Sequence, residues 1–199
     1  MTLHASESHL IERLLAQEPL AQKEFYERFS PKMLAVCMRY VGQLPQAEDL
    51  LIEGFLKAFK SLGSYKSQGS LEAWLRRIFI NTALDFLRKN KKDILSNALK
   101  NSTHEFIISA DDHAAAAEFE FEPNAACSLD LILACVSELP EPQALVFNLY
   151  VLDGYSHQEI SDFLGMSVAN SKSILHRSRK QLKEALIQLK TNAYEKVRI

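Results

Sequence analysis

The sequence predicts an all-α protein of two small helical bundles joined by an acidic linker, with a helix-turn-helix in the second bundle. Apolar residues recur at steps of three and four along most of the chain, which is the period of helices with one buried face. Within residues 1–100, Gly and Pro other than Gly54 fall at or next to short breaks between the periodic stretches. The period lapses across residues 101–127, where the chain is acidic. Two helical modules separated by a linker are therefore expected.

The first module, residues 1–100, is expected to be a bundle of three or four helices. Breaks are predicted at Ser30-Pro31, at residues 42–45 and at residues 63–70. The helical stretches between them are residues 20–41, as one long helix or a helix pair, residues 46–62 and residues 70–92. Pro31 fits a new helical segment after Ser30, because Pro is tolerated in the first turn of a helix.

Residues 101–127 are interpreted as a mobile linker, because they combine an alanine run with acidic residues and lack a helical period. The alternation of Phe and Glu over residues 119–122 leaves open a second interpretation, in which this segment docks on a partner. Helices resume in the second module, residues 128–190. Ser128 is expected to cap a helix over residues 129–139, and Pro142 to open another over residues 143–152. The tail, residues 191–199, is too short to form a sensing domain.

The helix-turn-helix is predicted from helix-capping residues. Ser156 and Glu159 form an S-x-x-E capping box, which marks the start of a helix. Gly165 stops that helix, since Gly enters the left-handed conformation without a steric penalty. Ser167 then offers a second N-cap. Two helices joined by so short a turn are typical of a helix-turn-helix that binds DNA.

The second helix of this motif carries a basic polar face. Its apolar stripe contains Val168, Ile174, Leu175 and Leu182. The polar complement of that stripe consists of Lys172, Ser173, His176, Arg177, Arg179 and Lys180. A helix of this width fits the major groove of DNA. The alternative interpretation is a solvated basic face on an ordinary helical hairpin.

Charge is distributed unevenly along a chain whose net charge is −2. Residues 1–100 contain 15 Lys or Arg and 11 Asp or Glu, residues 101–171 contain 12 acidic and no basic residues, and residues 172–199 contain 8 basic and 2 acidic residues. Two basic ends separated by an acidic middle indicate two modules that face nucleic acid. The acidic middle is expected to suppress binding to bulk DNA, because non-specific affinity depends on neutralised phosphates.

Several classes of protein are not indicated by the sequence. It has no apolar run of membrane-spanning length and no signal-peptide pattern at its start, so a cytoplasmic location is expected. The three cysteines, Cys37, Cys127 and Cys135, have no metal-binding spacing and are expected to be buried thiols. No catalytic motif is recognised: a Gly-rich phosphate loop, H-E-x-x-H and G-x-S-x-G are all lacking. We therefore expect no enzyme activity, no cofactor and no metal site.

Beyond these local patterns, the chain from about Ala21 to Leu189 resembles the sigma-70 family of RNA polymerase sigma factors, of the small extracytoplasmic-function type. Region 2 of that family resembles FYERFSPKMLAVCMRYVGQLPQAEDLLIEGFLKAFKSL together with SLEAWLRRIFINTALDFLRKNKK. Region 4 resembles LPEPQALVFNLYVLDGYSHQEISDFLGMSVANSKSILHRSRKQL. The resemblance implies two all-helical domains: residues 1–100 for polymerase docking and minus-ten recognition and melting, and residues 128–190 for minus-thirty-five recognition.

The same resemblance implies the partners. They are core RNA polymerase, through its β′ clamp helices and β flap, and promoter DNA. Many members of the family are also held by anti-sigma proteins, which makes such a protein a candidate partner. Asp49, Leu50 and Glu53 match the helix that docks on the clamp helices, together with Phe55 and Phe59, of which at least one is expected to be core.

For the minus-ten element, the matching residues lie in the loop at residues 65–70 and in the helix after it. Asn81 is the expected base reader, because a side-chain amide can pair with base edges. Trp74 shares an apolar stripe with Ile78 and is expected to be core. The candidate DNA-binding residues are Tyr65, Lys66, Arg77, Asn81, Arg88 and Lys89.

For the minus-thirty-five element, the resemblance implies contacts by Asn170, Lys172, Ser173, His176, Arg177 and Arg179. The chain departs from many relatives at Ile174, where a basic residue is common, and at Tyr150, where some have an arginine. Upstream recognition is therefore expected to be unusual in sequence or weaker. Ile52 and Gly54 also depart from the family pattern, which we interpret as a packing change.

Two other functions remain compatible with these patterns. A helix-turn-helix regulator that binds duplex DNA as a dimer would bind tightly and specifically without polymerase. A sigma-like adaptor would bind polymerase or an anti-sigma protein without initiating transcription.

Overall fold

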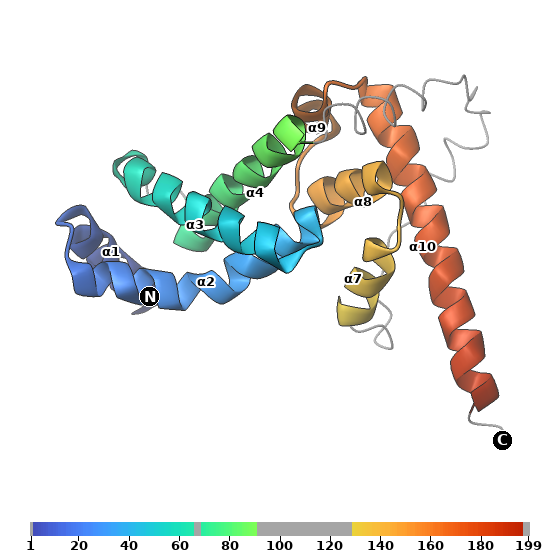
Figure 1. The fold of residues 1–199 in the computed structure, drawn as a ribbon, viewed down its shortest axis with the longest axis horizontal. Helices are drawn as coiled ribbons and strands as arrows, with labels where there is room; N and C mark the ends of the chain where they lie inside the picture. The colour runs from blue at the N-terminus through green and yellow to red at the C-terminus, as the bar shows by residue number, and fades with distance from the viewer. Residues whose placement is uncertain (1, 66–68, 91–128, 197–199) are drawn as a thin grey trace. The chain divides into compact units, whose positions relative to one another are not determined.

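The computed structural model describes residues 2–65, 69–90 and 129–196, with side chains over residues 7–65, 69–90 and 131–189. The described part of the chain is helical apart from short turns, so the all-α prediction is confirmed (Figure 1). The chain divides into two compact units, Met1–Asn90 and Lys91–Ile199. The linker predicted at residues 101–127 and the cap predicted at Ser128 lie outside the described residues.

Unit 1 is a helical bundle, as predicted. Its elements are α1 (Thr2–Leu15), α2 (Pro19–Val41), α3 (Leu44–Ser61), the 3-10 turn η1 (Leu62–Ser64) and α4 (Leu71–Asn90). Helices α2, α3 and α4 pack against one another, and α1 packs against α2. Three aromatic rings, one from each of the three central helices, form the centre of the core. The Phe55 ring lies 5.7 Å from that of Phe25 and 5.2 Å from that of Phe79, both in edge-on arrangements.

Helix α2 runs through the predicted break at Ser30-Pro31, so the prediction of a break there is wrong and that of one long helix is right. An internal Pro costs a helix about 3 kcal/mol through a lost hydrogen bond and a steric clash. Pro31 is exposed, whereas Phe29 and Met33 on either side of it are buried. Burial of these flanking side chains offsets the cost, because fully burying one large apolar side chain contributes about 1.5–3 kcal/mol.

Gly54 on α3 lies directly against the Phe79 ring of α4. A Cβ atom built at this position would lie 2.3 Å from Cε1 of Phe79. Since no real Cβ atom tolerates such a contact, only Gly allows the Phe79 ring to sit against α3. The interpretation of Gly54 as a packing change is therefore confirmed.

Unit 2 consists of α7 (Leu129–Ser137), α8 (Glu141–Phe147), the π-helical turn η3 (Asn148–Leu152), α9 (His157–Leu164) and α10 (Val168–Lys196). Helix α10 packs against α7, α8 and α9. The predicted helix over residues 143–152 changes to π-helical geometry after Phe147, and α7 ends two residues before the predicted position. Ser178 on α10 donates hydrogen bonds to the carbonyls of Ile174 and Gln143, which fastens α10 to α8.

Candidate nucleic-acid interface

The helix-turn-helix forms through the predicted caps. The Ser156 hydroxyl accepts a hydrogen bond from the Glu159 amide at 3.2 Å, and the Glu159 carboxylate accepts one from the Ser156 amide at 2.8 Å. Gly165 adopts a left-handed φ of 65° and its amide donates to the Ser161 carbonyl at 2.9 Å. Ser167 accepts from the Asn170 amide at 3.1 Å and so caps α10. The turn between α9 and α10 is therefore fixed by interactions within a few residues.

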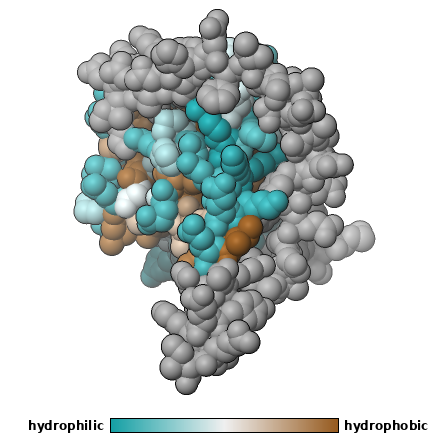
Figure 2. Space-filling view, turned by 90° about the vertical axis from the view of Figure 1, so that its right-hand side faces the viewer, coloured by the Kyte–Doolittle hydropathy of each residue, from teal (hydrophilic) through white to brown (hydrophobic). Residues whose placement is uncertain are grey.

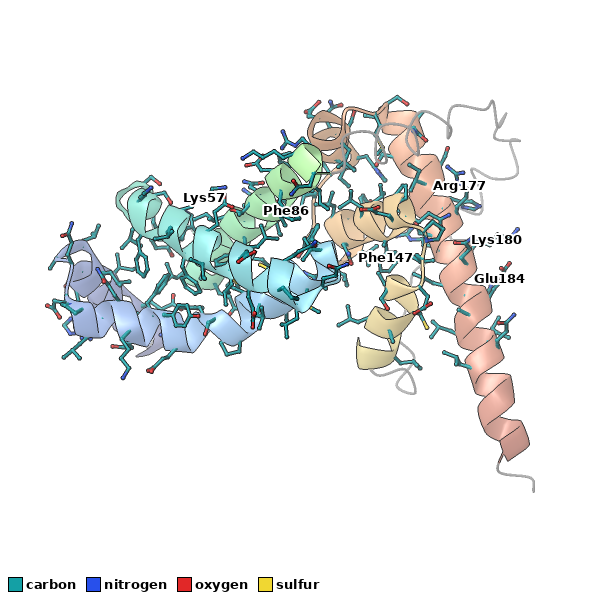
Figure 3. The ribbon with its side chains drawn as sticks, in the orientation of Figure 1. Lys57, Phe86, Phe147, Arg177, Lys180 and Glu184 are labelled. Carbon is teal, nitrogen blue, oxygen red and sulfur yellow. The ribbon has the colours of Figure 1, made fainter. Side chains whose placement is uncertain are left out.

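The exposed face of α10 carries most of the predicted minus-thirty-five residues. Lys172, Arg177 and Lys180 are exposed, and Asn170, Ser173 and His176 are half-buried. Arg177, Lys180 and Glu184 project from the side of α10 that faces away from α7 and α8 (Figure 3). This face is largely hydrophilic in the space-filling view (Figure 2). Ile174, where relatives commonly have a basic residue, is only 1% exposed and belongs to the core.

Arg179 is placed apart from this exposed face. Its side chain is half-buried, and the guanidinium carbon lies 5.9 Å from the centre of the Tyr150 ring. The Nε atom of Arg179 is buried and has no hydrogen-bond partner among the described residues. The structure thus places Arg179 against Tyr150 rather than beside Arg177, which argues against base reading by Arg179 in this arrangement.

Tyr150 also contacts His157, the first residue of α9. The two rings are stacked with their centres 4.3 Å apart and an interplanar angle of 22°. Nδ1 of His157 lies 2.9 Å from the hydroxyl of Ser171 on α10. Burial lowers the pKa of His157 below its ordinary value, and the nearby charges of Lys172 and Arg179 lower it further. Sequence reasoning missed this cluster, because helical periodicity gives no signal for side chains that meet across a turn.

In unit 1, the predicted minus-ten residues lie along α4 and the loop before it. Arg77, Asn81, Arg88 and Lys89 are exposed, and the first three share one side of α4 because their spacings are four and seven residues. Arg88 also pairs with Asp85 at 3.2 Å. Lys66 lies outside the described residues.

Tyr65 closes the loop before α4. Its hydroxyl donates to the carbonyl of Gly69 at 2.8 Å, and its ring lies 5.4 Å from the Trp74 ring. Burial raises the pKa of Tyr65, with a smaller contribution from the charge of Glu7. Trp74 is half-buried, so the prediction of a core residue describes only part of its surface. The paired rings form an aromatic wall next to the exposed side of α4.

The exposed face of α3 combines carboxylates with apolar side chains. Asp49 and Glu53 are exposed, as a docking role requires, whereas Leu50 is only 2% exposed and packs in the core. Ile52 and Leu56 are 58% and 55% exposed beside the carboxylates. The interpretation of Ile52 as a packing change is therefore wrong. Sequence reasoning also missed Leu56, because an apolar residue on an amphipathic helix is usually assigned to the core.

Phe55 is 3% exposed and packs in the core, as expected for at least one of the two phenylalanines on α3.

Glu53 and Lys57 pair at 2.8 Å, and Lys57 also lies 3.8 Å from Asp85 on α4. The carboxylate face of α3 is thereby joined to the basic side of α4 by exposed ion pairs. Such pairs contribute little to stability, since solvent screens them.

The described residues contain no cluster of three or more His, Cys, Asp or Glu side chains able to hold a metal ion. Cys37 and Cys135 are buried free thiols, as predicted, and burial raises the pKa of Cys37 to about 12. Within the same part of the chain, every helix is too short or too polar to span a membrane.

Solved structures similar to this chain include two proteins in complexes with a partner. One is the sigma factor RpoE bound to the anti-sigma factor NepR from Bartonella quintana. It is 24% identical, covers 82% of this chain and 95% of its own, and has a TM-score of 0.47. The other is CnrH bound to the cytosolic domain of CnrY, which is 18% identical over 90% of this chain and 96% of its own, also with a TM-score of 0.47.

Relatives in sequence are bacterial sigma factors. The ECF RNA polymerase sigma factor SigW of Bacillus subtilis is 28% identical over 81% of this chain and 86% of its own length. The RNA polymerase sigma-H factor of Pseudomonas aeruginosa is 27% identical over 94% of this chain and 96% of its own. A probable RNA polymerase sigma factor of Haemophilus influenzae is 29% identical over 80% of this chain and 87% of its own length.

Two family descriptions match the chain, one in each unit. Sigma-70 region 2 matches residues 25–93, from within α2 to three residues beyond the end of α4. Sigma-70, region 4, matches residues 129–182, from α7 into α10. The two matches together cover more than half of the chain. The chain therefore belongs to the sigma-70 family of RNA polymerase sigma factors and is of the extracytoplasmic-function type.

Proposed function

We propose that this chain recruits core RNA polymerase and directs promoter-specific initiation by recognising a minus-ten and a minus-thirty-five element. The observation that carries the proposal is the order of regions 2 and 4 on two helical units, each of which presents an exposed basic helix face. The assigned segments are residues 1–100 for docking and the minus-ten element, residues 101–127 as an acidic linker and residues 128–190 for the minus-thirty-five element. No covalent chemistry by the chain itself is required.

Readout of the minus-thirty-five element is assigned to the exposed face of α10. Helix-turn-helix proteins insert the first turns of the second helix into the major groove. Arg177 and Lys172 can donate to guanine edges or phosphates, and Ser173 and His176 can reach either. Asn170 lies at the start of α10, where an amide can pair with adenine.

Recognition of the minus-ten element is assigned to the exposed side of α4 and the aromatic wall formed by Tyr65 and Trp74. Strand opening exposes bases that stack on aromatic rings, and a side-chain amide reads their edges. Asn81 supplies the amide, and Arg77 and Arg88 lie on the same side of α4 to contact the backbone. Lys89 and Lys66 complete the set of cations.

Polymerase docking is assigned to the exposed face of α3. Asp49 and Glu53 can pair with arginines of the β′ clamp helices, and Ile52 and Leu56 supply apolar contact area between them. Leu50 contributes indirectly, because it anchors α3 in the core. The β flap and an anti-sigma protein are further candidate partners, which the family membership suggests.

Run-off transcription on a pool of genomic promoter fragments tests the proposal. Purified core polymerase is compared with and without the chain, and new transcripts that share two spaced elements are expected. Asp49→Ala/Glu53→Ala should abolish most of these transcripts, whereas Glu12→Ala/Glu27→Ala, which removes two other exposed carboxylates of unit 1, should retain them. Specific duplex binding by the chain alone, without polymerase-dependent transcripts, would instead support the dimeric regulator. Polymerase binding without transcripts would support the adaptor.

A further inference from the structure

Four side chains from three elements meet beside the turn of the helix-turn-helix. They are Tyr150 from η3, His157 from α9, and Ser171 and Arg179 from α10, and we name them the His157 clamp. Nδ1 of His157 lies 2.9 Å from the Ser171 hydroxyl, the Tyr150 ring stacks on the imidazole at 4.3 Å, and the Arg179 guanidinium lies 5.9 Å from the centre of the same Tyr150 ring. None of these contacts requires DNA.

We propose that His157 is a positioning residue for minus-thirty-five recognition, because it sets the orientation of α10 relative to α9 through Ser171 and Tyr150. The inference rests on the proposed function of α10 as the helix that reads the upstream element. It assigns to the clamp a different role from that of the exposed residues: they contact DNA, whereas the clamp determines where they are presented.

The Ser171 contact lies at the part of α10 that matters most for readout. Ser171 is completely buried, in the first turn of the helix, and its neighbours Asn170 and Lys172 are candidate DNA contacts. A hydrogen bond that joins this turn to the first residue of α9 restricts rotation of α10 about its own axis. Rotation of α10 would swing the neighbouring side chains relative to the bases, and bidentate base contacts tolerate little displacement.

Arg179 provides a second point of attachment farther along the same helix. It lies eight residues after Ser171, which corresponds to about 12 Å along the helix axis. Tyr150 links the two points, since one of its contacts is the His157 ring and the other is the Arg179 guanidinium. Contacts at two heights on α10 restrict its tilt as well as its rotation.

The surroundings of His157 favour the neutral imidazole. Burial disfavours the charged ring, and Lys172 and Arg179 from α10 add like charge, so the pKa lies below its ordinary value. A neutral ring forms this hydrogen bond in either tautomer: Nδ1 accepts from the Ser171 hydroxyl when the proton is on Nε2, and donates to it when the proton is on Nδ1. The clamp therefore operates by geometry and adds no charge of its own to the DNA interface.

The test measures the selectivity of the holoenzyme for two promoters that differ only in the upstream element, one intact and one scrambled. The full-length variants are His157→Phe, which retains an aromatic stack but not the hydrogen bond, Ser171→Ala, and the double variant. Each single variant is expected to lower the ratio of the holoenzyme's affinities for the intact and the scrambled promoter by about threefold to tenfold. This corresponds to the free energy that one hydrogen bond typically contributes. The double variant should lose no more than either single variant, because both remove the same bond.

Two further variants separate positioning from folding. Ser178→Ala removes the other fully buried serine of α10, which bonds to Ile174 and Gln143 outside the clamp. It is expected to lower the unfolding temperature while leaving the selectivity ratio unchanged. His157→Asn keeps a hydrogen-bonding group near the position of Nδ1 and should recover part of the selectivity lost in His157→Phe.

Unchanged selectivity in folded His157→Phe and Ser171→Ala holoenzymes, or losses that multiply in the double variant, would overturn the clamp while leaving the proposed function intact. If the unsubstituted holoenzyme already failed to distinguish the two promoters, upstream recognition by α10 would itself be wrong, and the positioning role would fail with it. The two failures are therefore distinguished by which protein shows the loss.

Discussion

Arg177 and Lys180 lie on the same exposed face of α10 and differ in the contacts that they can make with DNA. Arg177→Ala should weaken holoenzyme binding by about 1–3 kcal/mol and relax specificity at one base pair, because a guanidinium can pair with a guanine edge through two hydrogen bonds. Lys180→Ala should weaken binding equally across promoter sequences and lower the salt slope by about one. Affinities for a panel of single-base promoter variants at several salt concentrations measure both effects. An unchanged base profile in Arg177→Ala would remove Arg177 from the reading set.

Gly54 and Gly63 form a matched pair for testing the contact between α3 and α4. A helical Gly is normally less favourable than Ala by about 1 kcal/mol, so Gly→Ala in a helix is usually stabilising. Gly54→Ala should reverse that sign and destabilise the chain by about 1–3 kcal/mol, because its Cβ would collide with Phe79. Gly63→Ala has open space around it and should be nearly neutral. Urea unfolding measures both, and a stabilised Gly54→Ala variant would contradict the packing described here.

His157 should make stability depend on pH. Its folded-state pKa is lower than the ordinary value of 6.5 expected for the unfolded chain, so the unfolded chain binds this proton more tightly. The stabilising contribution of neutral His157 is therefore complete above pH 6.5, and it is lost as the pH falls through the lower pKa of His157 in the folded chain. His157→Phe should show a smaller loss of stability on acidification than the unsubstituted chain, as measured by urea unfolding at several pH values. Parallel pH profiles for the two proteins would count against the assigned protonation state.

At the scale of one element, α3 presents an apolar surface that folding alone does not explain. Exposed Ile52 and Leu56 flank the carboxylates of Asp49 and Glu53, and their burial in an interface is favourable at about 25 cal/mol per Å² of apolar area. Ile52→Ser/Leu56→Ser should therefore weaken binding to core polymerase by at least tenfold without lowering the unfolding temperature. Leu20→Ser on α2 is the control, since Leu20 is 73% exposed outside this face.

Titration of labelled chain with core polymerase gives the affinities of these variants. Equal affinity of the α3 double variant and the parent would show that the docking surface lies elsewhere. Equal loss in the Leu20→Ser control would indicate a general effect of removing exposed apolar area rather than a specific interface.

At the scale of the whole molecule, charge separation along the chain is expected to restrict unassisted binding to DNA. The 12 acidic residues of positions 101–171 oppose the 8 basic residues of positions 172–199. Replacing Glu118, Glu120 and Glu122 with Gln should raise the affinity of the free chain for random duplex DNA, because fewer negative charges repel the phosphates. Fluorescence anisotropy at low salt measures the change. An affinity equal to that of the parent would show that these carboxylates do not oppose DNA binding.

The helical class, the order of the two modules and the helix-turn-helix with its caps could all be predicted from the sequence alone. These features were predictable because they depend on residues close together in the chain. Ser156 and Glu159 cap α9 from three positions apart, and Gly165 ends it within the same turn. The apolar period likewise identified most of α2, α3 and α4, although it did not show that α2 continues through Pro31.

Packing between helices, by contrast, determines which side of each helix is left uncovered. Leu50 and Ile52 are both apolar and two residues apart, yet one is core and the other is exposed, because α2 and α4 cover only part of α3. Arg177 and Arg179 are the same residue type on the same helix, yet Tyr150 lies against only Arg179. The contact between His157 and Ser171 joins residues 14 positions apart across a turn. The helical period fixes the angle between successive side chains around the helix axis. Neighbouring elements determine which of those side chains face solvent.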